Sequence, residues 1–240
     1  MTAETPPPAG PPSTPDEGQA RPVDDPRAAQ ILATEHWSLI AGRSLAYNEA
    51  FTRAGMFLTF LSASLIVVGF LVASDRFAEA VIPIVILLLA VNLFVGMATL
   101  GRIFDSGIEE LAAVRGMNRI RHAYTEMIPG IQHYFIASIH DDRIGVTSAY
   151  GGGRRRLSPV VGILHGLTTT GGMVGSINCV LFAALIAVIS LGLDAPVGLA
   201  LGLSVGAFFA GLVVFTVWGY RTIARLTLFE NPMFPSPPES

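Results

Sequence analysis

Four stretches of apolar, uncharged residues, each long enough to cross a membrane, dominate the chain. They cover residues 54–74, 80–101, 171–193 and 195–220, and none contains Asp, Glu, Lys, Arg or His. A helix rises about 1.5 Å per residue, so about 20 such residues match a hydrocarbon core about 30 Å thick. The pattern therefore predicts an all-α polytopic membrane protein with four transmembrane helices in two hairpins.

The polar segments on either side of the first hairpin repeat apolar side chains at three- and four-residue steps, which is typical of amphipathic helices. Before the hairpin, this stripe comprises Ile31, Leu32, His36, Leu39, Ile40, Tyr47 and Phe51. After it, the stripe comprises Ile108, Leu111, Val114, Met117, Ile120, Tyr124 and Met127, and Pro129–Gly130 should end the helix. We expect the two helices to bury their stripes against each other as a stalk. The alternative is that both lie flat in the headgroup layer.

Both ends of the chain are rich in proline. Residues 1–27 hold eight prolines and no apolar run, so they cannot bury enough surface to fold and are predicted to be disordered. The tail from Asn231 to Ser240 holds four prolines and is also expected to be loose. The predicted organisation is a disordered tail (1–27), a cytoplasmic amphipathic helix (28–53), a first transmembrane hairpin (54–101), a cytoplasmic helical segment and linker (102–170), a second transmembrane hairpin (171–220) and a cytoplasmic C-terminal tail (221–240).

Composition and charge agree with a membrane setting. Mean hydropathy is +0.56, with 51% hydrophobic and 14% charged residues, which disfavours a soluble helical protein with buried core helices. All 15 basic residues are arginine, and only Arg76 lies in a hairpin loop. Because cytoplasmic loops carry the excess of basic residues, both termini and the central segment are predicted to be cytoplasmic, across the plasma (inner) membrane. No basic helix points to a nucleic-acid partner.

The central segment contains one group of candidate metal ligands. The group comprises His122, His133, His140, Asp141 and Asp142. Its spacing matches no known ligand motif, and Asp141–Asp142 followed by Arg143 is more typical of a solvated turn with a local ion pair. We therefore predict no metal and no cofactor.

Residues 151–156 read Gly-Gly-Gly-Arg-Arg-Arg, which combines backbone N–H groups with guanidinium groups. This combination resembles a phosphate cradle, but it lacks the Lys-Ser/Thr ending of a P-loop. The favoured interpretation is that Arg154, Arg155 and Arg156 contact anionic lipid, and nucleotide binding is the alternative.

Small and amide side chains are the informative residues inside the spans. Small residues recur every four positions at Gly198, Gly202, Gly206 and Ala210, and again at Gly171 and Gly175. This spacing favours close helix packing, within one chain or between chains. Asn92 and Asn178 lie at similar depths, so we predict that both face the bundle interior and are candidates to pair with each other. A pore-lining or substrate role is the alternative.

The absence of ionisable residues from the spans disfavours several functions. Proton-coupled exporters need a carboxylate in the membrane, and intramembrane proteases need aspartates, a metal pair or an activated serine. The sequence also lacks a potassium-filter motif and an arginine-rich voltage sensor. We therefore predict no catalytic residues and no enzyme activity.

Two segments carry a resemblance to a known family. They are Glu35–Ser44, continuing through Tyr47–Arg53 into Met56–Leu58, and Gly116–Tyr124 with the later His140–Arg143. They resemble an uncharacterised family of integral membrane proteins of high-GC bacteria, over about residues 28–225. The resemblance implies a four-span topology and no catalytic residues.

The layout of residues 28–128, a helix followed by two spans and a helix, is similar to two-span effector modules of bacterial conflict systems, which implies membrane perforation. Two functional hypotheses follow. The favoured one is a non-catalytic, self-associating scaffold or regulatory component that contacts the bilayer and a cytoplasmic protein partner. The alternative is an oligomeric pore or channel-like effector gated by the cytoplasmic helices.

Overall fold

The computed structural model describes residues 22–73, 78–150, 166–225 and 227–237, and within these ranges it is all-helical, with no strand. Residues 1–21 of the segment predicted to be disordered lie outside the described residues. The described part of that segment begins with a short 3-10 helix, η1 (Pro22–Asp24).

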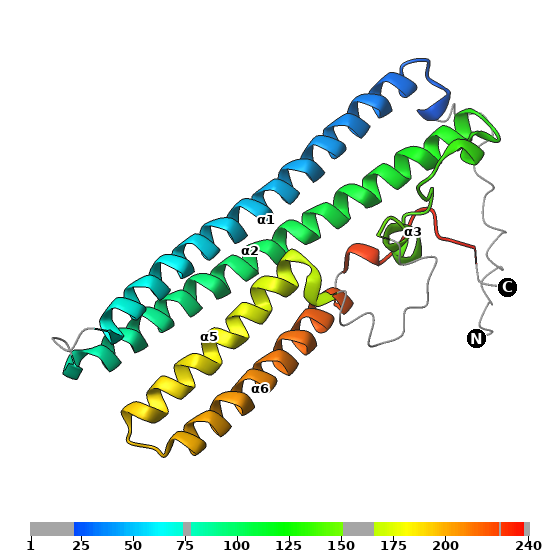
Figure 1. Cartoon of the computed structure of the whole chain (residues 1–240). Helices are drawn as coiled ribbons and strands as arrows, with labels where there is room; N and C mark the ends of the chain where they lie inside the picture. Colours follow the sequence, from blue (N-terminus) through cyan, green and yellow to red (C-terminus); the bar gives the residue numbers. More distant parts are fainter. Residues whose placement is uncertain (1–21, 74–77, 151–165, 226, 238–240) are drawn as a thin grey trace, which may run out of the picture.

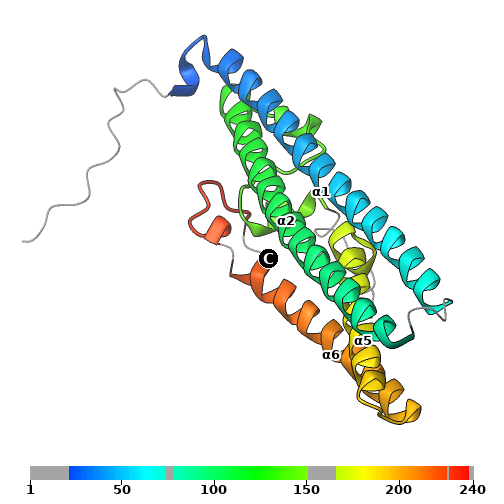
Figure 2. The same ribbon diagram turned by 90° about the vertical axis from the view of Figure 1, so that its left-hand side faces the viewer.

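The two longest helices are α1 (Ala28–Val72, 45 residues) and α2 (Ala78–Met127, 50 residues). At about 1.5 Å per residue they are about 68 and 75 Å long, and they lie antiparallel along their length (Figures 1 and 2). In each helix, an uncharged apolar half continues without a break into a polar half. We call residues 28–53 and 102–127 the polar halves.

Two shorter helices, α5 (Thr170–Gly192) and α6 (Val197–Ala224), make a second antiparallel pair. Thr169 caps α5, because its side-chain oxygen accepts a hydrogen bond from the backbone N–H of Gly172. α5 packs on the apolar half of α2 and α6 packs on α5, so the four helices stand in a row, α1–α2–α5–α6 (Figure 1). All four are long and apolar enough to cross a membrane.

Ionic contacts join α1 to α2 where the uncharged stretches end. Glu49 accepts hydrogen bonds from Arg53 on its own helix (2.8 Å) and from Arg102 on α2 (3.1 Å). The bond from Arg53, followed by that from Arg102, lowers the pKa of Glu49. Arg53 precedes the uncharged stretch of α1 and Arg102 follows that of α2. Because both bond Glu49, the ends of these two stretches lie at the same level.

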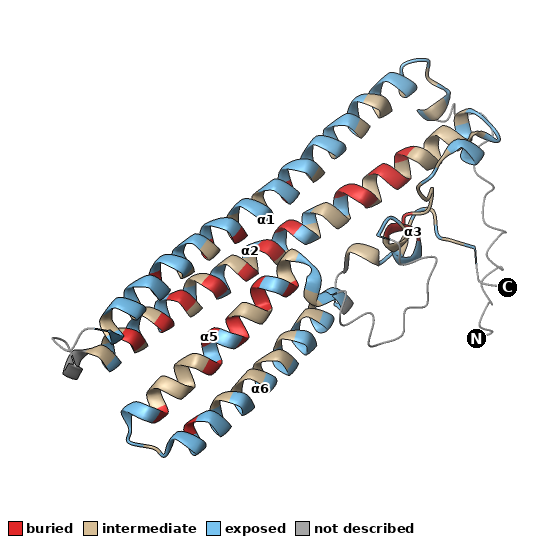
Figure 3. Cartoon of the chain, in the orientation of Figure 1, coloured by how far each residue is buried: buried red, intermediate tan, exposed pale blue. Residues whose placement is uncertain are grey.

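Two clusters of buried side chains hold the helices together. One joins the apolar parts of α1, α2 and α5 around Phe57, Leu100 and Val174. The other joins Val114 and Met117 of α2 to the short helix α3 (Arg143–Ser148) and is covered by Leu39 of α1. α2 carries more of the buried residues than any other helix, whereas α1 and α6 are largely exposed (Figure 3).

The predicted stripe of α1 is only partly buried. Leu39 packs on α2 as expected, but Ile31, Ile40, Tyr47 and Phe51 are 64%, 37%, 61% and 66% exposed, so the prediction is wrong for these four residues. The reason is that the polar half of α1 has only α2 as a long neighbour, which covers a narrower strip than the seven residues span.

Candidate functional site

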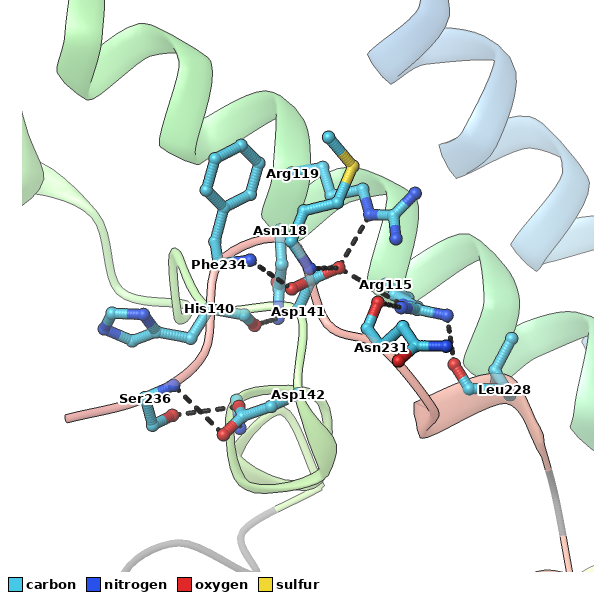
Figure 4. Close-up of polar contacts among 12 residues, drawn as sticks. Arg115, Asn118, Arg119, His140, Asp141, Asp142, Leu228, Asn231, Phe234 and Ser236 are labelled. Carbon is cyan, nitrogen blue, oxygen red and sulfur yellow. Dashed lines mark hydrogen bonds and ion pairs between the residues drawn. The ribbon is translucent and has the colours of Figure 1, made fainter. Parts of the chain in front are cut away.

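The most elaborate polar cluster surrounds Asp141, a carboxylate with no exposed surface beside the polar half of α2 (Figure 4). Arg119 donates to it at 2.7 Å and Arg115 at 3.3 Å. The backbone N–H groups of Phe234 (2.8 Å) and Met233 (3.2 Å) also donate to it. One acidic side chain thus binds both α2 and the end of the chain.

Further contacts fix this C-terminal segment, which we define as residues 227–237. The backbone N–H of Asp141 donates to the carbonyl of Phe234 (3.1 Å), so the two residues pair in both directions. The ring of Phe234 stacks on that of His122, with centroids 3.7 Å apart. Arg115 also donates to the carbonyl oxygens of Leu228 and Asn231.

Asp142 has a separate role from its neighbour. Its side chain caps α3 by accepting from the N–H of Gly145 (2.8 Å), and it also accepts from the N–H (3.1 Å) and hydroxyl (2.9 Å) of Ser236. Between Asn231 and Pro237, proline removes three donors, and three of the four remaining amides donate to Asp141 or Asp142. The segment therefore offers a set of donors that matches the two carboxylates.

The surroundings of Asp141 stabilise its ionised form. Burial raises the pKa of this carboxyl group, but the N–H of Phe234, the guanidinium of Arg119 and the N–H of Met233 together lower it to about 2. Asp142 behaves similarly: burial opposes ionisation, and the N–H groups of Gly145 and Ser236 lower the pKa. Both groups are thus held as acceptors, which suits binding and gives neither a proton to donate near neutral pH.

These contacts overturn two expectations. Asp141–Asp142 is not a solvated turn, and the residues from Asn231 to Pro237 are not loose, because the two carboxylates bind them. The candidate metal ligands His133 and His140 do not join the aspartates: within the described residues no group of three His, Cys, Asp or Glu side chains converges as a metal site.

Asn118 of α2 holds the residue that precedes Asp141 in place. Its Nδ2 donates to the carbonyl of His140 at 2.7 Å, and its Oδ1 accepts from Arg121 at 2.7 Å. The side chain is 1% exposed, so both bonds form away from water, where a missing partner would cost about 1–3 kcal/mol. Asn118 therefore positions the backbone that presents Asp141.

The two amides predicted to face the bundle interior are both buried, with Asn92 1% and Asn178 4% exposed. Nδ2 of Asn92 donates to the carbonyl of Leu88 (2.8 Å), and its Oδ1 has no partner. Asn178 lies directly over Gly96 of α2, where any side chain would collide with it, and both its amide atoms are without a partner. The candidate pair therefore makes no hydrogen bond with each other in the described residues.

The small residues divide into two groups. A side chain at Gly175 would overlap the ring of Phe215 on α6, so this glycine is required for packing within the chain, whereas one at Gly171 would make an ordinary contact with Ile103 on α2 at 3.5 Å. In contrast, a side chain at Gly198, Gly202 or Gly206 would meet nothing within 4 Å. Ala210 is exposed as well, so this face of α6 has no partner among the described residues.

Arg154, Arg155 and Arg156 lie outside the described residues, and their contact with anionic lipid stays a prediction. No known protein family, curated protein or solved structure matches this chain. The family resemblance seen in the sequence likewise stays a prediction.

Proposed function

We propose that this chain is a four-span inner-membrane protein that acts as a non-catalytic, self-associating scaffold or regulatory component. Its polar halves and C-terminal segment lie in the cytoplasm, where they contact a protein partner. The distribution of arginine supports this orientation, since 14 of 15 basic residues fall outside the two hairpin loops.

The observation that carries self-association is the open face of α6. α6 stands at one edge of the row, and its face of Gly198, Gly202, Gly206 and Ala210 is uncovered. Lipid chains are as apolar as leucine, so helices in a membrane associate by close packing, for which small residues are suited. A second copy of α6 fits this requirement.

A partner outside the membrane is supported by the exposed apolar side chains of the polar half of α1. Trp37 is 71% and Leu45 is 70% exposed, although neither lies in an uncharged stretch. Large aromatic and aliphatic groups exposed on a polar helix are the kind of residue that anchors protein interfaces.

Self-association is tested by energy transfer between donor- and acceptor-labelled full chains in phosphatidylcholine vesicles, followed as lipid dilutes the protein. Gly202→Ile should weaken association about tenfold, since measured helix–helix terms in membranes are about 0.6–2 kcal/mol. The matched control is Gly69→Ile, because Gly69 is also open but lies on α1. A wild-type chain that stays monomeric, or equal association of the two variants, would contradict the scaffold.

The alternative, an oligomeric pore gated by the polar helices, is favoured by one observation: two uncharged amides, Asn92 and Asn178, lie buried in the apolar part. Current recordings from the full chain in planar bilayers separate the two functions. Reproducible unitary currents that change with Asn92→Leu would establish the pore and contradict a purely structural role.

A further inference from the structure

A cavity of about 1410 Å³ lies where the polar halves of α1 and α2 meet the start of α5 and the end of α6. Small-molecule sites commonly measure about 300–1,000 Å³, so this space admits a ligand larger than a drug-sized molecule. It is bordered by Arg43 and Tyr47 of α1, Ser106 of α2, Gly171 of α5 and Gly219 of α6.

The cavity wall combines apolar side chains with a smaller number of polar ones. Its apolar side chains include Ala50, Ile103, Phe104 and Phe215. Its polar side chains include Arg43, Ser44, Ser106, Glu110, Tyr150 and Thr170. The wall residues of α1 and α2 all belong to the polar halves, and those of α2 begin at Ile103, next to Arg102, where an uncharged stretch stops. An amphiphile, which has both an apolar and a polar part, matches this combination of side chains beside the end of an uncharged stretch.

The charged groups of the cavity wall already have partners. Arg43 Nε donates to Glu110 at 3.0 Å, and its guanidinium carbon lies 5.6 Å from the centre of the Tyr150 ring. Burial, followed by the neighbouring Glu110, raises the pKa of Tyr150. The charges of Arg43 and Glu110 neutralise each other. A ligand in the cavity is therefore bound by other hydrogen-bond donors.

Three donors on the cavity wall remain open. Ser106 is only 4% exposed, and its hydroxyl makes no hydrogen bond among the described residues. The backbone N–H groups of Thr170 and Gly171, in the first turn of α5, likewise have no acceptor in the described part of the chain. A side chain at Gly171 would lie 3.5 Å from Ile103, so this helix start is within one turn of Ser106 along α2.

We propose that this cavity binds a membrane phospholipid. Its phosphate accepts hydrogen bonds from Ser106 and from the N-terminus of α5, and an acyl chain lies along Phe104 and Phe215. A helix of 23 residues presents free N–H groups and a positive dipole end at its start, both of which favour a phosphate. A phosphate only accepts hydrogen bonds in its ionised form, which suits three donors without acceptors of their own.

The test is native mass spectrometry of the full chain in detergent, titrated with dioleoylphosphatidylglycerol. We expect one tightly held lipid per chain. Gly107→Phe should lower its affinity at least about tenfold, because Gly107 lines the cavity and a side chain there meets nothing within 4 Å, so the ring has room to enter it. Gly101→Phe is the control, since Gly101 is equally open on the same helix but does not line the cavity.

Two further arms address the phosphate. Ser106→Ala should weaken binding about tenfold through the loss of one hydrogen bond to a charged group. Dioleoylglycerol, which has the same chains without phosphate, should bind more weakly still. A chain that retains no phospholipid, equal affinity of the Gly107 and Gly101 variants, or equal binding of dioleoylglycerol would overturn the proposal.

Discussion

Replacing Asp141 by asparagine should release the C-terminal segment from α2. Asparagine has the same shape, but it carries no charge and has only one acceptor atom. Arg115 and Arg119, 13% and 37% exposed, would lose their common counter-ion, and the N–H of Met233 or Phe234 would lose its acceptor. Breaking one side of a buried ion pair costs about 3–5 kcal/mol.

We expect the lower end of that range, because Arg119 remains partly solvated. About 3 kcal/mol corresponds to a shift of roughly 100-fold in the equilibrium between docked and undocked segments. Hydrogen exchange measured by mass spectrometry reports this directly, since prolines leave few amides in the segment and Met233, Phe234 and Ser236 are hydrogen-bonded only when it is docked.

The expected result is about 100-fold faster exchange at the amides of Met233 and Phe234, with the amides of α5 unchanged. The matched control is Asp105→Asn, which changes an exposed carboxylate on α2 whose one ion pair among the described residues is with Arg102. Unaltered exchange in the Asp141 variant, or equal acceleration in the control, would refute the conclusion that this carboxylate holds the segment.

Three further predictions concern stability and pH. Asn178→Leu should raise the free energy of unfolding in detergent by about 1–3 kcal/mol, because it removes two unpaired buried polar atoms; a loss of stability would indicate a partner for this amide. Gly175→Val should cost about 1–3 kcal/mol in the same assay because its side chain collides with Phe215, whereas Gly69→Val, in open space, should cost little; equal costs would contradict the packing of α5 on α6. The folded-state pKa of Asp141 lies below its usual 3.8, at about 2, so the contribution of this group is complete above pH 4 and is lost as pH falls from about 4 to 2, by about 2 kcal/mol. Pepsin cleavage of the C-terminal segment, normalised at each pH to the free peptide of residues 227–237, should rise over that range, and a pH-independent ratio would contradict the assignment.

The helices were the most predictable part of the fold. A bilayer core requires about 20 apolar residues per crossing, so the absence of charge marks a span with little dependence on the rest of the chain. The end of α2 at Met127 was also readable, because Pro129 and Gly130 follow it directly. Such signals are local, and each depends on a few neighbouring residues.

The contacts between distant segments were not predictable in the same way. Phe234 binds Asp141 across more than 90 residues, and prolines in the tail indicate a lack of regular structure without excluding docking. The prolines leave a few amides free to donate, and this was the one hint of an extended bound segment in the sequence. The position of Asn178 over Gly96 depends on the axial shift of α5 relative to α2. The periodicity of the sequence does not determine that shift.

The unbroken passage of α1 from its polar half into its apolar half makes it a lever. From Ala54 to Ala28 the helix extends about 40 Å beyond the uncharged stretch, with no proline at which to bend. Tilting such a rod by 10° displaces its far end by about 7 Å, provided the pivot lies at Ala54. A slight change in how the spans lean would thus reach a molecule attached near Trp37 as a movement larger than an atom's diameter, with no rearrangement inside the helix itself.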